Sequence, residues 1–322
     1  MSKAKVSTRL VKPDAAGIAE AARLLAAGGL VAFPTETVYG LGADATDPLA
    51  VARLFAAKAR PSFNPLIAHV ADVAAARRAG KLSPLAEKIA AEFWPGPLTL
   101  VVPASDLVCE LARAGLSTVA LRVPRHPVAE KLLAAFGKPI AAPSANRSGH
   151  VSPTTAQHVL ADLGGFVDLV VDGGPAPLGL ESTIVDMSGE GPRLLRSGGV
   201  PRGELERALG TALLAATDDM RAPGMLASHY ATRARLRLDA QQVRPGEALL
   251  AFGASWPAGA EAAAQVLDLS PRGDLVEAAA NLFAHLRALD ATGVSAIAVA
   301  PVPAHGLGEA INDRLKRAAA PR

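Results

Sequence analysis

Side chains that can bind a phosphorylated ligand are concentrated in a few short polar segments. Residues 34–42 (PTETVYGLG) place two threonine hydroxyls, a carboxylate and a phenol on a glycine-containing segment. Further along, Lys58 and Arg60 stand at the end of a predicted helix, just before a polar turn with two prolines. Arginine makes bidentate hydrogen bonds to phosphate and lysine acts as a compact point charge. The pair therefore suits a polyphosphate, although two cations at a helix C-terminus also complement the helix dipole.

Two predicted strands carry a side chain that can titrate or bear charge. Arg122 lies among apolar neighbours in residues 116–124. Because arginine is rarely buried without a partner, a carboxylate or phosphate is expected to face it. His69 lies on an earlier strand, where a histidine is more often structural than catalytic. Ser144 follows a third strand but lacks the G-x-S-x-G context of a nucleophile, which favours a hydrogen-bonding role.

The remaining polar segments are less specific. Residues 179–186 (GLESTIVD) and 194–198 (LLRSG) lie at predicted strand edges. Residues 40–45 fit the relaxed dinucleotide pattern G-x-G-x-x-A, but no helix opens from these glycines. An ordinary turn with two glycines at unusual dihedral angles is an equal alternative. The sequence has no Walker A, H-E-x-x-H, paired-cysteine or EF-hand pattern, so no metal site built from protein alone is specified.

Apolar periodicity predicts the elements that position these segments. Asp14 and the pairs Asp47-Pro48 and Ser83-Pro84 are typical of helix starts. Short apolar strands alternate with amphipathic helices, which indicates an α/β domain with both sheet faces largely covered. The predicted strands are 30–33, 65–70, 98–102, 119–123, 140–141, 167–171 and 183–185, and later helices are 127–136, 155–163 and 203–209.

A change of pattern follows this region. Residues 217–235 carry proline, glycine and charges without an apolar period, so we predict a linker there. Beyond it, apolar segments and two helical periods predict a second, smaller α/β domain. Its predicted strands are 249–252, 266–269 and 294–300, and its helices are 275–289 and 309–319.

Composition bounds the class of protein. The chain has 322 residues, a formal net charge of +3, 50% apolar residues and one cysteine. Intrinsic disorder and a disulfide scaffold are therefore excluded. No stretch approaches the roughly 18 apolar residues of a membrane span, and the N-terminus lacks a signal-peptide pattern, so we expect a cytoplasmic protein. The 12 aromatic residues, 8 Phe, 2 Trp and 2 Tyr, are too few to suggest a stacking platform for single-stranded nucleic acid.

Taken in order, the polar segments resemble the YrdC/Sua5 family in its long, two-domain form. The resemblance implies a YrdC-like twisted mixed sheet with helices around a basic concave cavity, in a catalytic domain over residues 1–216. It implies a linker over the cavity at 217–235 and a small Rossmann-like α/β domain at 236–322. The motifs that carry it are PTETVYGLG (34–42), K-x-R (58–60), S-x-N (144–146), ESTIVD (181–186), LLRSG (194–198) and PGM...HYA (223–231).

The resemblance also implies an activity. Members make L-threonylcarbamoyladenylate and pyrophosphate from L-threonine, bicarbonate and ATP, with Mg²⁺ arriving on ATP. A separate transferase then uses the product to make N6-threonylcarbamoyladenosine at position 37 of tRNA. Direct tRNA contact is not required, and no membrane is involved. By resemblance, Lys58 and Arg60 act in catalysis, and Thr35, His69, Arg122, Ala142 and Ser182 bind threonine. ATP is assigned to Lys58, Ser62, Thr118, Ser144, Asn146, Ser152, Arg196 and Tyr230.

Two alternatives differ in class. A module that binds structured RNA would use the same basic concavity, but its binding would depend on salt and not on ATP or threonine. A carbamoyl-transfer module related to hydrogenase maturation is disfavoured, because cysteine-rich zinc motifs and an acylphosphatase-like segment are absent from the sequence. The compact sets of hydroxyls and amides beside the cations favour a small ligand.

Overall fold

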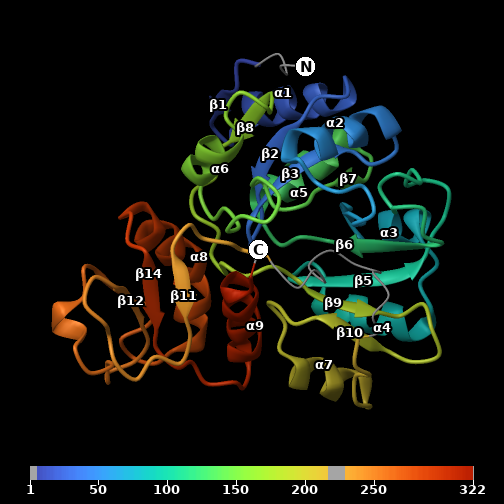
Figure 1. The fold of residues 1–322 in the computed structure, drawn as a ribbon. Helices are drawn as coiled ribbons and strands as arrows, with labels where there is room; N and C mark the ends of the chain where they lie inside the picture. The colour runs from blue at the N-terminus through green and yellow to red at the C-terminus, as the bar shows by residue number, and fades with distance from the viewer. Residues whose placement is uncertain (1–5, 217–228, 322) are drawn as a thin grey trace. The chain divides into compact units, whose positions relative to one another are not determined.

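The chain forms two compact units in a computed structural model that describes residues 6–216 and 229–321 (Figure 1). The first unit holds 6–148, 153–176 and 181–216, and the second holds 149–152, 177–180 and 229–321. Of the predicted linker, residues 217–228 lie outside the described residues, and with them the PGM part of the last motif. Among the described helices, none combines the length and hydropathy needed to cross a membrane.

The first unit is built on a mixed sheet, as the resemblance implied. Among the described residues ten strands pair in the order β1-β8-β2-β3-β7-β4-β6-β5-β9-β10. Parallel and antiparallel pairs alternate irregularly along this order, with β4 parallel to β6 and β5 antiparallel to β6. The strands are β1 (Arg9–Val11), β2 (Val31–Pro34), β3 (Tyr39–Asp44), β4 (Ile67–His69), β5 (Leu98–Pro103), β6 (Thr118–Arg122), β7 (Ile140–Ala141), β8 (Leu169–Val171), β9 (Thr183–Asp186) and β10 (Arg193–Arg196).

Local signals fix the helices of this unit. The side chains of Asp14, Asp47 and Ser83 each accept a hydrogen bond from a backbone N–H in the first turn, as their positions predicted. This caps donors that have no partner inside the helix. The helices are α1 (Ala15–Ala26), α2 (Pro48–Lys58), α3 (Val73–Ala79), α4 (Pro84–Phe93), α5 (Pro127–Phe136), α6 (Ala156–Leu163) and α7 (Arg202–Leu209).

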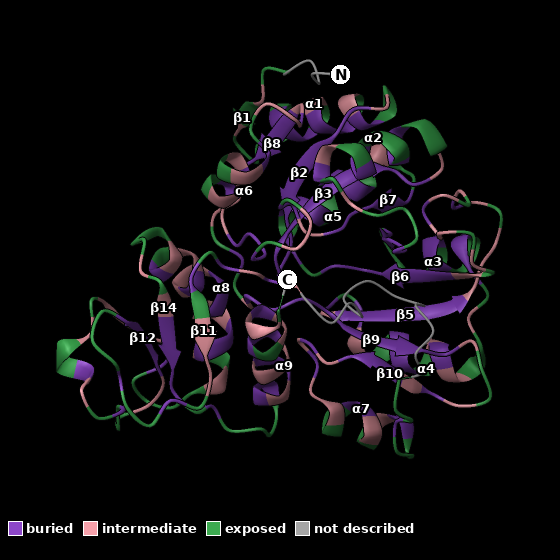
Figure 2. Cartoon of the chain, in the orientation of Figure 1, coloured by how far each residue is buried: buried purple, intermediate pink, exposed green. Residues whose placement is uncertain are grey.

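The two faces of the sheet are covered unequally. Helices α1 and α5 pack together over one face around β2 and β8, where Phe33 lies fully buried. The opposite face contributes to the largest core cluster, with residues from α2, α3, α4, α6 and α7 (Figure 2). From β4 to β10, the side turned away from that core carries a small apolar cluster of Ile67, Val101, Ala120, Ile184 and Leu195. The other positions on this side are available for polar groups.

The glycine-rich part of the 34–42 segment is a strand and not a loop. Residues 39–44 form β3, which pairs antiparallel with β2 and with β7. Both glycines have ordinary strand dihedral angles, so neither the dinucleotide loop nor the glycine turn is correct. Gly42 is needed for packing: a Cβ there would stand 2.9 Å from side-chain atoms of both Phe33 and Ile140.

The second unit has a four-stranded parallel sheet in the order β11-β14-β12-β13. Strand β11 (Arg235–Arg237) begins at the last residue of the predicted linker. The buried residues Leu282 and Leu286 of α8 (Leu275–Ala291) follow the predicted helical period. This parallel α/β arrangement matches the expected Rossmann-like domain. Its other elements are β12 (Ala248–Ala251), the short 3₁₀ helix η1 (Ala260–Ala262), β13 (Val266–Asp268), β14 (Ala296–Val299) and α9 (Leu307–Ala319).

Replacing Gly42 with alanine should destabilise the first unit. The added methyl group would overlap Phe33 and Ile140, and overpacking of a core costs about 1–3 kcal/mol. Urea denaturation should show a lower midpoint for Gly42→Ala. The matched control is Gly189→Ala, because a Cβ at the exposed Gly189 meets nothing within 4 Å. Equal midpoints for the two variants would contradict the packing role.

Candidate active site

Strand alternation gathers polar side chains on the side of the sheet that carries the small apolar cluster. Side chains two residues apart on a strand share a face. His69 therefore shares a face with Ile67, and Arg122 with Ala120, both members of the small apolar cluster. The parallel register pairs His69 with Arg122 across β4 and β6. All the groups of this face that are described below belong to the first unit.

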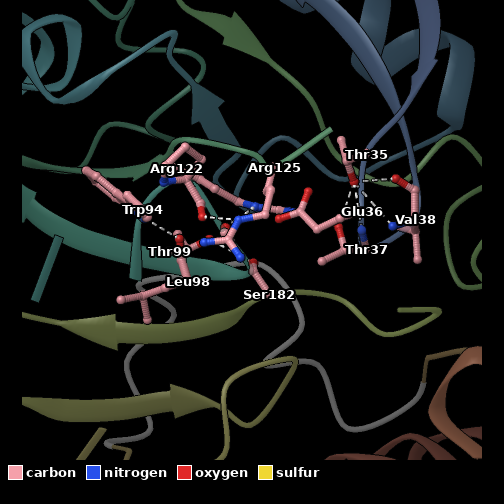
Figure 3. Close-up of polar contacts among 12 residues, drawn as sticks. Thr35, Glu36, Thr37, Val38, Trp94, Leu98, Thr99, Arg122, Arg125 and Ser182 are labelled. Atoms are coloured by element: carbon pink, nitrogen blue, oxygen red, sulfur yellow. Dashed lines mark hydrogen bonds and ion pairs between the residues drawn. The ribbon is translucent and has the colours of Figure 1, made fainter. Parts of the chain in front are cut away.

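A buried hydroxyl pair joins β5 to the segment before β9. Ser182 Oγ lies 2.7 Å from Thr99 Oγ1, and both residues are fully buried (Figure 3). The guanidinium of Arg196 donates from Nε and Nη2 to the Ser182 carbonyl oxygen, at 3.1 and 2.8 Å. Its Nη2 also lies 3.1 Å from Ser182 Oγ. The serine predicted to bind threonine and an arginine predicted to bind ATP are thus in direct contact.

Arg122 is held between a backbone carbonyl and a carboxylate. Its Nε donates to the Gly96 carbonyl oxygen at 3.3 Å. Its Nη2 lies 2.8 Å from Oε1 of Glu36, and both side chains are almost completely buried. Figure 3 shows Glu36 extending from the turn between β2 and β3 toward the arginine side of the site. The sequence prediction that a buried Arg122 needs an acidic partner is confirmed, and that partner is Glu36.

The Thr35 hydroxyl organises the turn that carries Glu36. Thr35 Oγ1 donates to the Val38 carbonyl oxygen at 2.7 Å and lies 2.7 Å from Thr37 Oγ1. It also accepts from the backbone N–H groups of Thr37 and Val38. Such side-chain-to-backbone bonds fix a turn. The turn therefore holds the Glu36 backbone in one position.

Lys58 is a buried link between α2 and the loop that follows β7. Its Nζ donates to the carbonyl oxygens of Ser144, at 2.6 Å, and of Asn146. Burial lowers the pKa of Lys58 well below its usual value, the charge of Arg60 lowers it further, and Asp162 acts in the opposite direction. The K-x-R and S-x-N motifs are therefore brought together, although they are far apart in the sequence.

Arg60 extends the group of cations toward Arg196. Its Nη2 donates to the Pro65 carbonyl oxygen at 3.1 Å, while its buried Nε has no hydrogen-bond partner among the described residues. Burial, followed by the charge of Arg196, lowers the pKa of Arg60 to about 10. In the described parts of the chain, neither Lys58 nor Arg60 forms an ion pair with a carboxylate. Like charges held together in this way are stabilised by an anion.

His69 is neutral at ordinary pH. Burial, followed by the charge of Arg122, lowers the pKa of His69 to about 3. Its ring meets that of Phe33 edge to face, with centroids 6.4 Å apart. A group with so low a pKa is a weak base near neutrality. The position of His69 fits a role in shaping the part of the site beside Arg122.

The other predicted residues differ in their surroundings. Ala142 is buried, with its backbone N–H bonded to Ile67, while Thr118 is half-buried and Ser62 exposed. Ser152 and Tyr230 belong to the second unit, where Tyr230 stacks on Phe283 with ring centroids 5.3 Å apart.

Two polar residues of the site were not assigned from the sequence. Glu36 was noted only as the carboxylate of the 34–42 motif. Its place between two threonines, just after an apolar strand, could have indicated a site residue. Thr99 was a hydroxyl inside an apolar strand, a pattern with many structural explanations. Across residues 6–216 and 229–321, no group of three or more His, Cys, Asp or Glu side chains is placed to hold a metal ion.

The fold and site together define an α/β protein with a buried, cation-rich polar site. Residues 23–198 match the family described as Sua5/YciO/YrdC, telomere recombination. Residues 200–320 match the C-terminal domain of threonylcarbamoyl-AMP synthase. The chain therefore belongs to the Sua5 family of threonylcarbamoyl-AMP synthases, in the long form that carries both domains.

Full-length relatives support this membership. The threonylcarbamoyl-AMP synthase of Pyrococcus abyssi is 43% identical, over 92% of each chain. That of Bacillus subtilis is 40% identical, over 95% of this chain and 93% of the relative. The crystal structure of P. abyssi Sua5 complexed with L-threonine aligns with a TM-score of 0.89 at 39% identity, over 98% of each chain. Escherichia coli YciO shares only the fold, with a TM-score of 0.54 over 62% of this chain.

The low pKa of His69 predicts a specific pH dependence of stability. The unfolded chain binds this proton near pH 6.5 and the folded chain only near pH 3. The stability that neutral His69 contributes is thus present above pH 6.5 and is lost as pH falls toward 3. As pH falls through that window, the free energy of unfolding of the wild type should decrease relative to that of His69→Gln by about 1.4 kcal/mol per pH unit.

Urea denaturation at several pH values measures this difference. The matched control, His158→Gln, makes the same substitution at another histidine of the first unit. His158 lies half-buried on α6, with its ring beside Thr154. A wild-type minus His69→Gln difference that is constant below pH 6.5 would show that His69 is not buried as a neutral group.

Proposed function

We propose that this chain makes L-threonylcarbamoyladenylate and pyrophosphate from L-threonine, bicarbonate and ATP. The observation that carries the proposal is the chain of cations Lys58, Arg60 and Arg196 beside the hydroxyl of Ser182. A site of this kind suits a triphosphate held next to a small polar substrate. The family membership and the threonine complex of P. abyssi Sua5 support the same activity.

Threonine would bind on the Arg122 side of the site. The guanidinium of Arg122 is suited to the substrate carboxylate, and Ser182 to one of its polar groups. Thr35, His69 and Ala142 would complete the walls of this subsite. His69 and Ala142 are buried, and the Thr35 hydroxyl is already engaged in its turn, so their main contribution would be shape.

ATP would bind on the Lys58 side. Lys58, Arg60 and Arg196 would contact the phosphates, and the loop held by Lys58 would present Ser144 and Asn146. Because the described residues include no cluster of His, Cys, Asp or Glu placed to hold a metal, Mg²⁺ would arrive on the ATP phosphates and offset their negative charge. Ser62, Thr118, Ser152 and Tyr230 are further proposed ATP contacts.

The reaction needs positioning more than covalent catalysis. The deprotonated threonine amine would attack CO₂ and lose a proton, or attack bicarbonate and expel water, to give N-carboxythreonine. A carbamate oxygen would then attack the α-phosphorus of ATP, and the bond to pyrophosphate would break. The fixed cations would stabilise negative charge that develops on the phosphoryl group and on the leaving group.

The finer predictions from the sequence extend this proposal. The product would pass to a separate tRNA threonylcarbamoyl transferase as the first step of N6-threonylcarbamoyladenosine formation, in the cytoplasm and without obligatory tRNA contact by this chain. We further propose a catalytic domain over 1–216, a connecting segment over 217–235 and a C-terminal domain over 236–322.

One assay tests the activity and its main alternative. Purified protein incubated with threonine, bicarbonate, ATP and Mg²⁺ should release pyrophosphate and form a product with the mass of threonylcarbamoyl-AMP. Omission of threonine should abolish both signals. Pyrophosphate release that ignores threonine would contradict the proposal. Salt-dependent RNA binding without product would support the RNA-binding module.

Replacing Arg60 with alanine should nearly abolish the activity. Loss of one cation that acts in the transition state should lower kcat/KM by roughly 10²–10³-fold, by analogy with the loss of one oxyanion-hole donor. The same loss is expected for Lys58→Ala, which would also release the carbonyl oxygens of Ser144 and Asn146. Pyrophosphate release from ATP gives the rates.

The control for these variants is Arg23→Ala, which removes an exposed cation on α1 of the same unit. Its kcat/KM should stay within about twofold of wild type, since surface substitutions usually have small effects. Circular dichroism should show folded protein for all three variants. Wild-type turnover by folded Arg60→Ala and Lys58→Ala would refute the assignment of these two cations.

A further inference from the structure

The carboxylate of Glu36 is buried with an incomplete set of partners. The residue is only 7% exposed, and neither side-chain oxygen accepts a hydrogen bond from the described residues. Its nearest opposite charge is Nη2 of Arg122, at 2.8 Å from Oε1. The geometry of this ion pair is not that of a hydrogen bond. Nη2 of Arg122 therefore also has no hydrogen-bond partner among the described residues. A buried carboxylate normally accepts several hydrogen bonds, because leaving them unmade is costly.

The surrounding structure fixes the backbone that carries Glu36 and the guanidinium that faces its carboxylate. The turn between β2 and β3 is closed by the Thr35 hydroxyl and by the bond from the Thr35 backbone N–H to the Val38 carbonyl oxygen. Arg122 is anchored from the other side through its Nε to Gly96. The two charges are therefore held beside each other with hydrogen-bonding capacity left over on both.

This arrangement complements the two charges of an amino acid. A free amino acid carries a carboxylate and an ammonium group on one carbon atom. A guanidinium binds the carboxylate, and an acceptor-only carboxylate binds the ammonium group. We propose that Glu36 binds the ammonium group of the amino-acid substrate, so that Arg122 and Glu36 together recognise its two charged ends. The inference rests on the proposed function, because it concerns the threonine subsite.

The assignment gives the site a way to orient the nitrogen that reacts. An ammonium hydrogen bonded to Glu36 fixes the position of the nitrogen relative to the carboxylate on Arg122, and the ammonium group then loses one proton before the amine attacks. His69 Nδ1 is also buried with no hydrogen-bond partner among the described residues, but His69 is neutral at ordinary pH and so has no negative charge to balance an ammonium group. His126 is a further group near Glu36: burial lowers the pKa of His126, and the charge of Glu36 acts in the opposite direction. His126 Nδ1, however, accepts from the Val128 backbone N–H at the start of α5.

A purely structural role makes a different prediction. If Glu36 only held Arg122 in place, its loss would weaken every ligand whose carboxylate binds Arg122. If Glu36 binds the ammonium group, its loss should weaken only ligands that carry an amine. The two roles are separated by comparing L-threonine with 3-hydroxybutanoate of matching configuration, which keeps the carboxylate and the hydroxyl but lacks the amine.

The experiment uses isothermal titration calorimetry on the full chain. We expect Glu36→Gln to raise the Kd for threonine about tenfold or more, because hydrogen bonds to charged groups are among the strong ones. The Kd for 3-hydroxybutanoate should change by less than about twofold. In the assay, KM for threonine should rise about tenfold while KM for ATP stays within about twofold. Glu36→Asp should recover part of the loss, because it keeps the negative charge.

Controls make each outcome decisive. Glu130→Gln removes an exposed carboxylate on α5 and should bind threonine like the wild type. An equal loss for both ligands in Glu36→Gln, or an unchanged threonine KM, would overturn the inference. If Glu36→Gln does not fold, the same comparison is made with Glu36→Asp, and an equal loss for both ligands again overturns it. Failure of the wild type to bind threonine would instead refute the proposed function.

Discussion

The geometry of the site depends on the hydrogen bonds that the buried side-chain nitrogen of Lys58 donates. This nitrogen joins the last turn of α2 to the loop after β7 through the carbonyl oxygens of Ser144 and Asn146. The backbone N–H of Ser148 returns a bond to the Lys58 carbonyl oxygen. Burying this nitrogen without acceptors would be costly, so the loop can take only a conformation that presents its carbonyls. Two motifs distant in sequence thereby acquire one fixed relative position.

The same region contains unfavourable electrostatic interactions that a bound ligand can offset. Arg60 lies close enough to Lys58 and Arg196 for their charges to disfavour one another. On the other side, Glu36 and Arg122 face each other with unmade hydrogen bonds. Arrangements of this kind reduce stability, and they persist because the large apolar core of the unit compensates for them. Groups already oriented before the reaction need little reorganisation during it.

Unequal covering of the sheet makes room for these groups. On one side from β4 to β10, Leu121 and Val185 lie in the large core that includes helix residues. On the other side, Ala120 and Ile184 belong to a small apolar cluster. Arg122 and Ser182 lie two residues from Ala120 and Ile184, respectively, and so lie on this same side. One face of each strand therefore contributes to the stability of the unit, and the other carries polar chemistry.

By itself, the sequence determined most of the helix starts and the family. The caps at Asp14, Asp47 and Ser83 act within one helical turn, and the predicted helix over 127–136 has the same bounds in the structure. The ordered motifs were sufficient to indicate the long Sua5 form, because their residue types and order are visible without any fold. Local signals need no knowledge of distant parts of the chain.

Tertiary structure alone decided which of these residues meet. The strand over 39–44 was missed because Gly42 is explained by the side chains of Phe33 and Ile140, and Ile140 lies nearly a hundred residues away. The pairing of Glu36 with Arg122 likewise depends on where the β2–β3 turn and β6 lie in the sheet. Strand order and register are set by non-local packing, and local propensity carries no information about them.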